Sequence, residues 1–177
     1  MESCPPQLLS EIGSSAPRPS VDWGEAERRL AMKIPSDYRD LVNAGGAGLW
    51  FGTIRVYRPG DPLSDRDLLS SAAGFEDLEV LWEMGESPPV DPMPADARLI
   101  EWASTTAGHV LYWWVEPGLL PERYPVYVGS EEGSRWEKFD FTTSRFLLGI
   151  LSGRIESRIL TEITTGDSVT VFRPYKS

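Results

Sequence analysis

The chain has 177 residues, of which 41% are hydrophobic and 25% are charged, and its formal net charge is −10 at pH 7. This composition predicts one soluble domain with its own core, and no apolar run is long enough to cross a bilayer. The acidic balance disfavours direct binding to nucleic acid phosphates. No secretory signal is recognisable, and the single cysteine, Cys4, fits the reducing cytoplasm, where we expect the protein.

Two helices are predicted in the N-terminal part. Residues 1 to 20 are rich in Pro, Ser and Gly and predict a loose leader. Apolar residues at helical spacing then predict a helix over residues 23 to 34, capped by Asp22. A second helix is expected to start at Ser36 as its cap and to end in the glycine-rich segment 43 to 48, because glycine permits a left-handed exit.

The middle and the second half predict a sheet. Residues 53 to 57 alternate as a half-buried strand does, and the acidic stretch 63 to 84 predicts one or two short helices joined by loops. Runs rich in aromatic and β-branched residues then predict four antiparallel strands, over residues 98–103, 110–115, 124–128 and 135–139.

A helix over residues 143 to 151 closes this sheet, with Thr143 as its expected cap. For the tail, residues 154 to 177, two interpretations stay open. It forms either a second helix or a hairpin that turns at Thr165-Gly166-Asp167.

The order of residues adds a resemblance to a known family. A tryptophan, a glutamate, a proline, an aspartate–tyrosine pair and a glycine-rich exit follow one another, and a further glycine precedes the aromatic strand: Trp23, Glu27, Pro35, Asp37, Tyr38, Gly46, Gly48 and Gly108. Over residues 20 to 153 this pattern resembles the SMI1/KNR4 (SUKH) family. The resemblance implies a single α+β domain, in which an antiparallel or mixed sheet packs against N-terminal helices and a C-terminal helix. Residues 154 to 177 would pack on that domain or trail it, and we expect structural roles for the eight pattern residues.

The resemblance also implies a function, because many bacterial members of the family bind and neutralise toxins, often nucleases. Residues 61 to 101 carry 11 acidic side chains and two arginines, a local charge of −9, whereas the rest of the chain sums to −1. We expect this segment to bind a basic toxin domain by electrostatic attraction. The expected contact residues are Asp65, Asp67, Glu76, Asp77, Glu79, Glu83, Glu86 and Trp114, the last because Trp113 and Trp114 must point to opposite faces of their strand.

Other functions stay open beside this one. The acidic run is equally typical of a solvated face. The same fold suits a small-molecule or peptide-binding module with an aromatic pocket, or a regulatory scaffold. Enzymatic function is not expected. His109 is the only histidine, no nucleophile motif is present, and two Cys and His residues in total are too few for structural zinc. We therefore predict no catalytic residue, metal or cofactor, and the sequence leaves the oligomeric state open.

Overall fold

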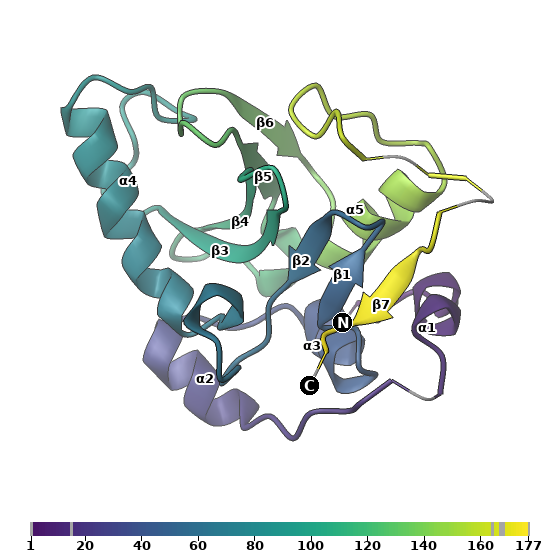
Figure 1. The fold of residues 1–177 in the computed structure, drawn as a ribbon. Coiled ribbons are helices and arrows are strands. Elements are labelled where there is room, and N and C mark those ends of the chain that lie inside the picture. Colours follow the sequence, from purple (N-terminus) through teal and green to yellow (C-terminus); the bar gives the residue numbers. More distant parts are fainter. Residues whose placement is uncertain (1, 15, 164, 167–168, 177) are drawn as a thin grey trace.

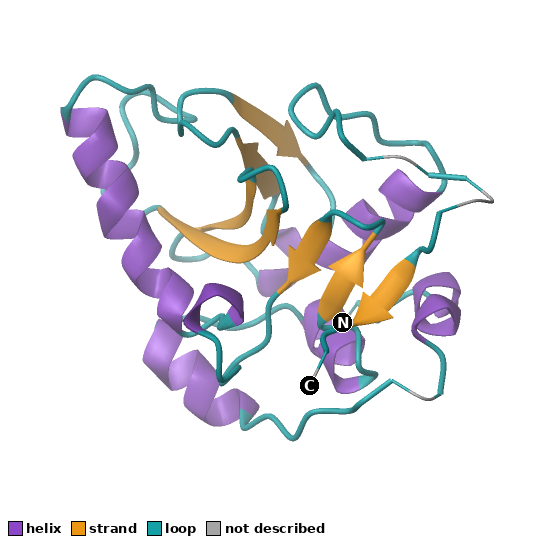
Figure 2. Cartoon of the chain, viewed as in Figure 1, coloured by secondary structure: helices purple, strands orange, loops and turns teal. Residues whose placement is uncertain are grey.

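Helices surround one antiparallel sheet in the computed structural model of the chain, which describes residues 2–14, 16–163, 165–166 and 169–176 (Figures 1 and 2). The five α-helices are α1 (Pro6–Ile12), α2 (Trp23–Leu30), α3 (Ser36–Asn43), α4 (Gly74–Glu83) and α5 (Thr143–Leu151). Three short 3-10 helices are η1 (Ser64–Arg66), η2 (Ser70–Ala73) and η3 (Pro121–Arg123). The predicted α+β, single-domain fold is confirmed.

The sheet has seven strands in the order β6-β5-β4-β3-β2-β1-β7, and every neighbouring pair is antiparallel. The strands are β1 (Gly48–Trp50), β2 (Ile54–Val56), β3 (Arg98–Thr105), β4 (Val110–Val115), β5 (Val126–Gly129), β6 (Trp136–Phe139) and β7 (Phe172–Pro174). The register of β3 against β4 shifts between Glu101 and Ala103. Such a bulge lets both Trp102 and Ala103 reach the same core cluster.

One face of the sheet carries most of the buried apolar surface. Side chains of α1, α2, α3 and α5 join the sheet there in one cluster, which we call the main core. Trp113 and Trp102 lie fully buried in it with nearly parallel rings 6.2 Å apart, and Tyr38 meets Trp113 edge-on at 4.9 Å. Burial of large aromatic side chains is the main stabilising contribution that this face offers.

The other face is covered over only part of its width. Alternation along β4 points Tyr112 and Trp114 away from the main core, and α4 covers this face with the loop that follows it (Figure 1). We call this smaller cluster the α4 layer. Its members are Phe75, Leu78, Trp82, Met93, Ala97, Leu99, Val110, Tyr112, Trp114, Leu119, Tyr127 and Trp136.

The first twenty residues differ from the loose leader that the sequence predicts. Helix α1 packs against α5 and β7, and Leu8 and Ile12 are buried in the main core. Cys4 is buried too, and burial raises the pKa of its thiol to about 12. Proline and serine are frequent in this segment, but Cys4, Leu8, Ile12 and Ala16, spaced four residues apart, are all buried in the main core.

The tail packs on the domain. Ile155, Ile159 and Leu160 are buried in the main core, and β7 pairs with β1 at the edge of the sheet. Neither alternative for the tail describes this, because the described part forms no helix and its strand pairs with β1 rather than within the tail. Of the proposed turn, Asp167 lies outside the described residues.

Helix caps agree with the sequence in one case of three. The Asp22 carboxylate accepts a hydrogen bond from the Glu25 N–H at 2.9 Å, as predicted. Ser36 and Thr143 instead lie inside their helices, where Pro35 and Thr142 hold the cap positions. The Ser36 hydroxyl donates to the Glu2 carbonyl, so it ties the N-terminal segment to α3.

Candidate functional site

Helix α4 presents a surface that combines carboxylates with exposed apolar side chains. Phe75, Leu78 and Trp82 turn toward the sheet, at the spacing of one helix face. The rest of the helix faces solvent, and Val80 and Met84 keep 53% and 78% of their surface exposed. The exposed residues Glu76, Asp77, Glu79, Val80, Leu81, Glu83, Met84 and Glu86 together form what we call the α4 surface.

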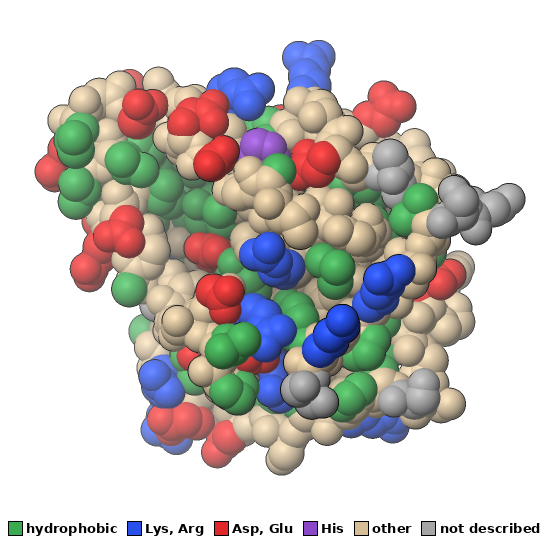
Figure 3. Space-filling view, viewed as in Figure 1, with side chains coloured by type: hydrophobic (Ala, Val, Ile, Leu, Met, Phe, Trp, Pro, Cys, Tyr) green, Lys and Arg blue, Asp and Glu red, His purple; other side chains and the backbone are tan. Residues whose placement is uncertain are grey.

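The carboxylates of the α4 surface are not used in ion pairs that stabilise the fold. Within the described ranges, none of them forms a salt bridge with a lysine or arginine. Figure 3 shows red and green side chains side by side over α4. An apolar patch rimmed by charge of one sign is the composition expected of a surface that binds a protein of opposite charge.

The charges on the helix suit the helix dipole at one end only. Glu76 and Asp77 lie in the first turn, where the helix dipole favours negative charge. Glu83 is the last helical residue, the last turn contains no basic residue, and no side chain caps the helix N-terminus. A carboxylate at the C-terminus opposes the dipole. Glu76 and Asp77 therefore suit the dipole, whereas Glu83 does not contribute to helix stability.

Two of the predicted contact residues lie elsewhere, on the η1 loop. Asp65 is exposed there, so it remains available. Asp67 is half-buried and holds its own loop together, because its carboxylate accepts from the Gly60 N–H at 2.8 Å and the Leu69 N–H at 3.0 Å. Asp67 therefore has a structural role in this loop, and its expected contact role stays a prediction.

Trp114 is not the exposed contact that strand alternation predicts. It does point away from Trp113, but only 6% of it is exposed because its ring stacks against Tyr127 in the α4 layer. Its indole N–H donates to the Glu116 carboxylate at 3.1 Å. Alternation gave the correct face, and the second layer that covers this face was not foreseen.

Glu101 shows a further difference within the acidic segment. This carboxylate is mostly buried and accepts a hydrogen bond from the Tyr57 hydroxyl. Burial raises its pKa above the usual value, although the Tyr57 hydrogen bond acts in the opposite direction. Asp61 is buried as well and pairs with Arg58. The carboxylates at both ends of the acidic segment therefore form buried contacts within the fold.

Four of the eight pattern residues make specific hydrogen bonds, namely Trp23, Glu27, Asp37 and Tyr38. Trp23 donates its indole N–H to the Asn43 side chain at 3.0 Å, which joins α2 to the end of α3. Tyr38 donates its hydroxyl to the Tyr57 carbonyl at 2.6 Å. Glu27 accepts from the Ile34 N–H at 3.0 Å. Burial alone would raise the pKa of Glu27, but hydrogen bonds from Lys33 and the Ile34 N–H lower it overall.

Asp37 makes the longest-range contact of the pattern. Its buried carboxylate accepts from both the N–H and the hydroxyl of Ser144, at 2.8 and 2.6 Å. These atoms lie in the first turn of α5. Asp37 therefore satisfies the N-terminus of the closing helix from α3, and no residue near Ser144 in the sequence provides this cap.

The remaining pattern residues shape the backbone. Pro35 precedes α3 as its cap residue in an extended conformation. A Cβ on Gly46 would lie 2.7 Å from the Leu41 carbonyl oxygen, and one on Gly48 would lie 2.4 Å from the Arg173 carbonyl oxygen. Gly108 has a φ of +91° in the β3–β4 turn. Glycine is required at these places by close approach or by conformation.

His109 stands at the same turn and acts structurally. Its Nδ1 accepts a hydrogen bond from the Glu131 N–H at 3.1 Å, which joins the β3–β4 turn to the β5–β6 loop. Throughout the part of the chain that is described, no three His, Cys, Asp or Glu side chains are grouped so that they could hold a metal ion. None of the described helices is long and apolar enough to cross a membrane.

No family model matches this chain, and neither a curated protein nor a solved structure matches it with significance. The resemblance to the SMI1/KNR4 family therefore rests on the order of residues and elements given above. Sequence reasoning had located the carboxylates of α4, but it missed their apolar neighbours. Apolar residues at Val80, Leu81 and Met84, beyond those needed for one buried face, were the signal that could have revealed them.

Proposed function

We propose that this chain is an immunity-type protein of SMI1/KNR4 (SUKH) character, which binds and neutralises a toxin domain without catalysing a reaction. The observation that carries the proposal is the α4 surface, where unpaired carboxylates surround exposed apolar side chains. A toxin of nuclease type fits this surface best, because a nuclease must present cations to hold phosphates. The carboxylates of α4 would pair with those cations and so prevent them from binding the nucleic acid.

The two kinds of side chain would contribute differently to such a complex. Charged residues at the rim mainly raise the association rate and fix the orientation, and their effect falls with added salt. Val80 and Met84 would lose their exposed apolar area on binding and so slow dissociation. The cytoplasm is the compartment that we propose, since the nucleic acid that a nuclease toxin would attack lies there.

The test is a mixture of this protein with the toxic domain encoded beside it. We expect a stoichiometric complex and loss of the toxic activity. The sharpest variant is Glu79→Lys with Glu83→Lys, which should reduce the association rate at least about tenfold at low salt. Its matched control is Glu11→Lys with Glu156→Lys, two exposed carboxylates outside α4, because both double variants change the net charge by the same amount.

The control separates a local surface from the general charge of the protein. Equal slowing in both double variants would mean that only the net charge matters, and the α4 surface would lose its role. A folded, active neighbouring toxin that this protein neither binds nor inhibits would overturn the immunity function itself.

A further inference from the structure

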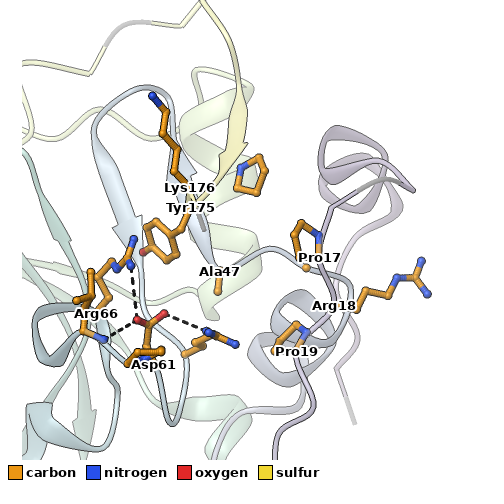
Figure 4. Close-up of a pocket in the computed structure, with 13 residues that line it drawn as sticks. Pro17, Arg18, Pro19, Ala47, Asp61, Arg66, Tyr175 and Lys176 are labelled. Carbon is orange, nitrogen blue, oxygen red and sulfur yellow. Dashed lines mark hydrogen bonds and ion pairs between the residues drawn. The ribbon is translucent and has the colours of Figure 1, made fainter.

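A basic pocket lies apart from the α4 surface. It measures about 520 Å³, a size that suits a small ligand. Four segments that are distant in the sequence form it: residues 17–19, 45–47, 58–66 and 174–176 (Figure 4). The packed N-terminal segment and the C-terminal tail thus meet at this place. Its walls include the apolar residues Pro17, Pro19, Ala47, Pro62, Leu63 and Pro174.

Two arginines are held in place inside the pocket by one buried carboxylate. Asp61 accepts from Arg58 Nε at 3.0 Å and lies 3.7 Å from a terminal nitrogen of Arg66. The Leu63 N–H also donates to Asp61 at 3.0 Å, which fixes the carboxylate. Arg66 lies over the ring of Tyr175, with its guanidinium carbon 4.1 Å from the ring centre. Both guanidinium groups are therefore oriented before any ligand arrives.

The hydrogen-bonding capacity of these arginines is only partly used. The Nε of Arg66 is buried and has no hydrogen-bond partner among the described residues. A guanidinium has five N–H donors, and a single carboxylate cannot satisfy two such groups. If the cluster were only a structural ion pair, one arginine would suffice for Asp61.

The pocket is positive although the protein is strongly acidic. Four cations and one carboxylate line it, a local charge of +3 in a chain whose net charge is −10. Arg18 and Lys176 lie at the rim, with side chains that extend away from Asp61 (Figure 4). Arg55 and the carboxylate of Asp65 both lie close enough to influence Tyr175, and Figure 3 shows blue side chains gathered over β1, β2 and β7. Such a concentration of cations attracts an anion.

We propose that this pocket binds a phosphate monoester attached to a flat apolar group. The planar fork of arginine matches phosphate oxygens in pairs, and both Arg58 and Arg66 line the pocket, with N–H groups beyond those that face Asp61. The Tyr175 ring and the proline side chains would contact the apolar part of the ligand. This inference is independent of the immunity function, and it gives the ligand-binding alternative a defined place, at a basic rather than a purely aromatic site.

The test is calorimetric titration of the full chain with phenyl phosphate, inorganic phosphate and phenol. We expect phenyl phosphate to bind at one equivalent, about tenfold more tightly than inorganic phosphate, and phenol not to bind. Equal affinity for the two phosphates would indicate free phosphate as the ligand and would overturn the apolar half of the proposal. Phenol binding as tightly as phenyl phosphate would overturn the anionic half.

Variants locate the binding. Arg66→Lys keeps the charge but removes the fork, and it should weaken phenyl phosphate binding about tenfold. Arg18→Gln with Lys176→Gln alters only exposed rim residues, and we expect a loss of about threefold. Arg29→Gln, an exposed arginine of α2 outside the pocket, should leave affinity unchanged. If Arg66→Lys binds like the wild type while its unfolding curve is normal, or if no phosphate binds at millimolar concentration, the proposal fails.

Discussion

The two faces of the sheet differ in how completely the side chains that cover them are buried. On the main-core face the polar groups of Tyr38, Trp113 and Asp37 are buried and have hydrogen-bond partners at 2.6 to 2.8 Å, although the buried indole N–H of Trp102 has none among the described residues. On the other face α4 leaves apolar side chains exposed and ends in a carboxylate that opposes its own dipole. The comparison teaches that most of the buried core lies on one face, so that the other can carry exposed side chains at little cost in stability.

The comparison can be tested with one tryptophan from each face. Trp113 is fully buried and donates to the Thr143 hydroxyl at 2.8 Å, so Trp113→Ala should cost about 3–5 kcal/mol of the free energy of unfolding. Trp82 is half-buried and its buried indole N–H lacks a partner within the described chain, so Trp82→Ala should cost only about 1–2 kcal/mol. Urea unfolding of both variants measures the difference. Equal losses of unfolding free energy in the two variants would contradict the view that the main-core face contributes more to stability.

The next largest effect concerns aspartates. Asp37→Ala removes the cap of α5 and leaves the Ser144 N–H and hydroxyl unsatisfied, which should cost about 2–3 kcal/mol. Asp77→Ala on the α4 surface should change stability by less than about 0.5 kcal/mol. Thermal or urea unfolding compares them. Asp37→Asn is the control, since it keeps an acceptor oxygen and should lose less than the alanine variant.

A smaller effect, of opposite sign, comes from Glu101. Because its pKa in the folded state is raised, the proton is bound more tightly in the folded protein than in the unfolded chain. Its stabilising contribution is therefore complete below the unfolded value near 4.5 and is lost as pH rises through the folded pKa. Glu101→Gln keeps an acceptor for the Tyr57 hydroxyl and removes the buried charge.

We therefore expect Glu101→Gln to stabilise the protein by about 1 kcal/mol at pH 7 and to have little effect at pH 4. Unfolding free energies at the two pH values check this. A variant that is equally stabilising at both would show that packing, and not the charge, is responsible.

The smallest effect is expected where the apolar side chains are exposed. Val80→Ser with Met84→Ser should change the free energy of unfolding by less than about 0.5 kcal/mol, because neither side chain is buried in the fold. The same double variant should shorten the lifetime of the proposed toxin complex. Surface plasmon resonance would measure this lifetime. A loss of more than about 1 kcal/mol in the free energy of unfolding would instead show that these side chains pack in the α4 layer.

Sequence reasoning was accurate where one segment contains its own signal. The helices that begin at Trp23 and Thr143 and the aromatic strand β4 show periodicity over six or more residues, and all three begin where predicted. Helix α2 ends at Leu30, before the predicted end at Ile34, because Ala31 adopts a left-handed conformation. Strands β1 and β7 are three residues long and were both missed, whereas β2 of the same length was predicted because the alternation extends over residues 53 to 57. The cap of α5 was misassigned because Asp37 lies more than a hundred residues before it.

The same distinction explains the two candidate sites. The carboxylates of α4 lie within one short segment of the sequence, so their common surface could be predicted from charge alone. The basic pocket could not, because Arg18, Arg58, Arg66 and Lys176 are scattered among the carboxylates of an acidic chain and only the fold brings them together. The net charge of the protein thus hides the sign of its most positive site.

The pairing of β1 with β7 has a consequence for how the molecule folds. These strands join residues 48–50 to residues 172–174, so their contact closes one of the longest loops in the chain. Closure of long loops slows folding, and β7 is expected to attach after the central strands have formed. Since Tyr175 and Lys176 follow β7 directly, the basic pocket is completed only in that final step. Ligand binding at the pocket would then report on completed folding, and it would draw the late-attached strand onto the sheet.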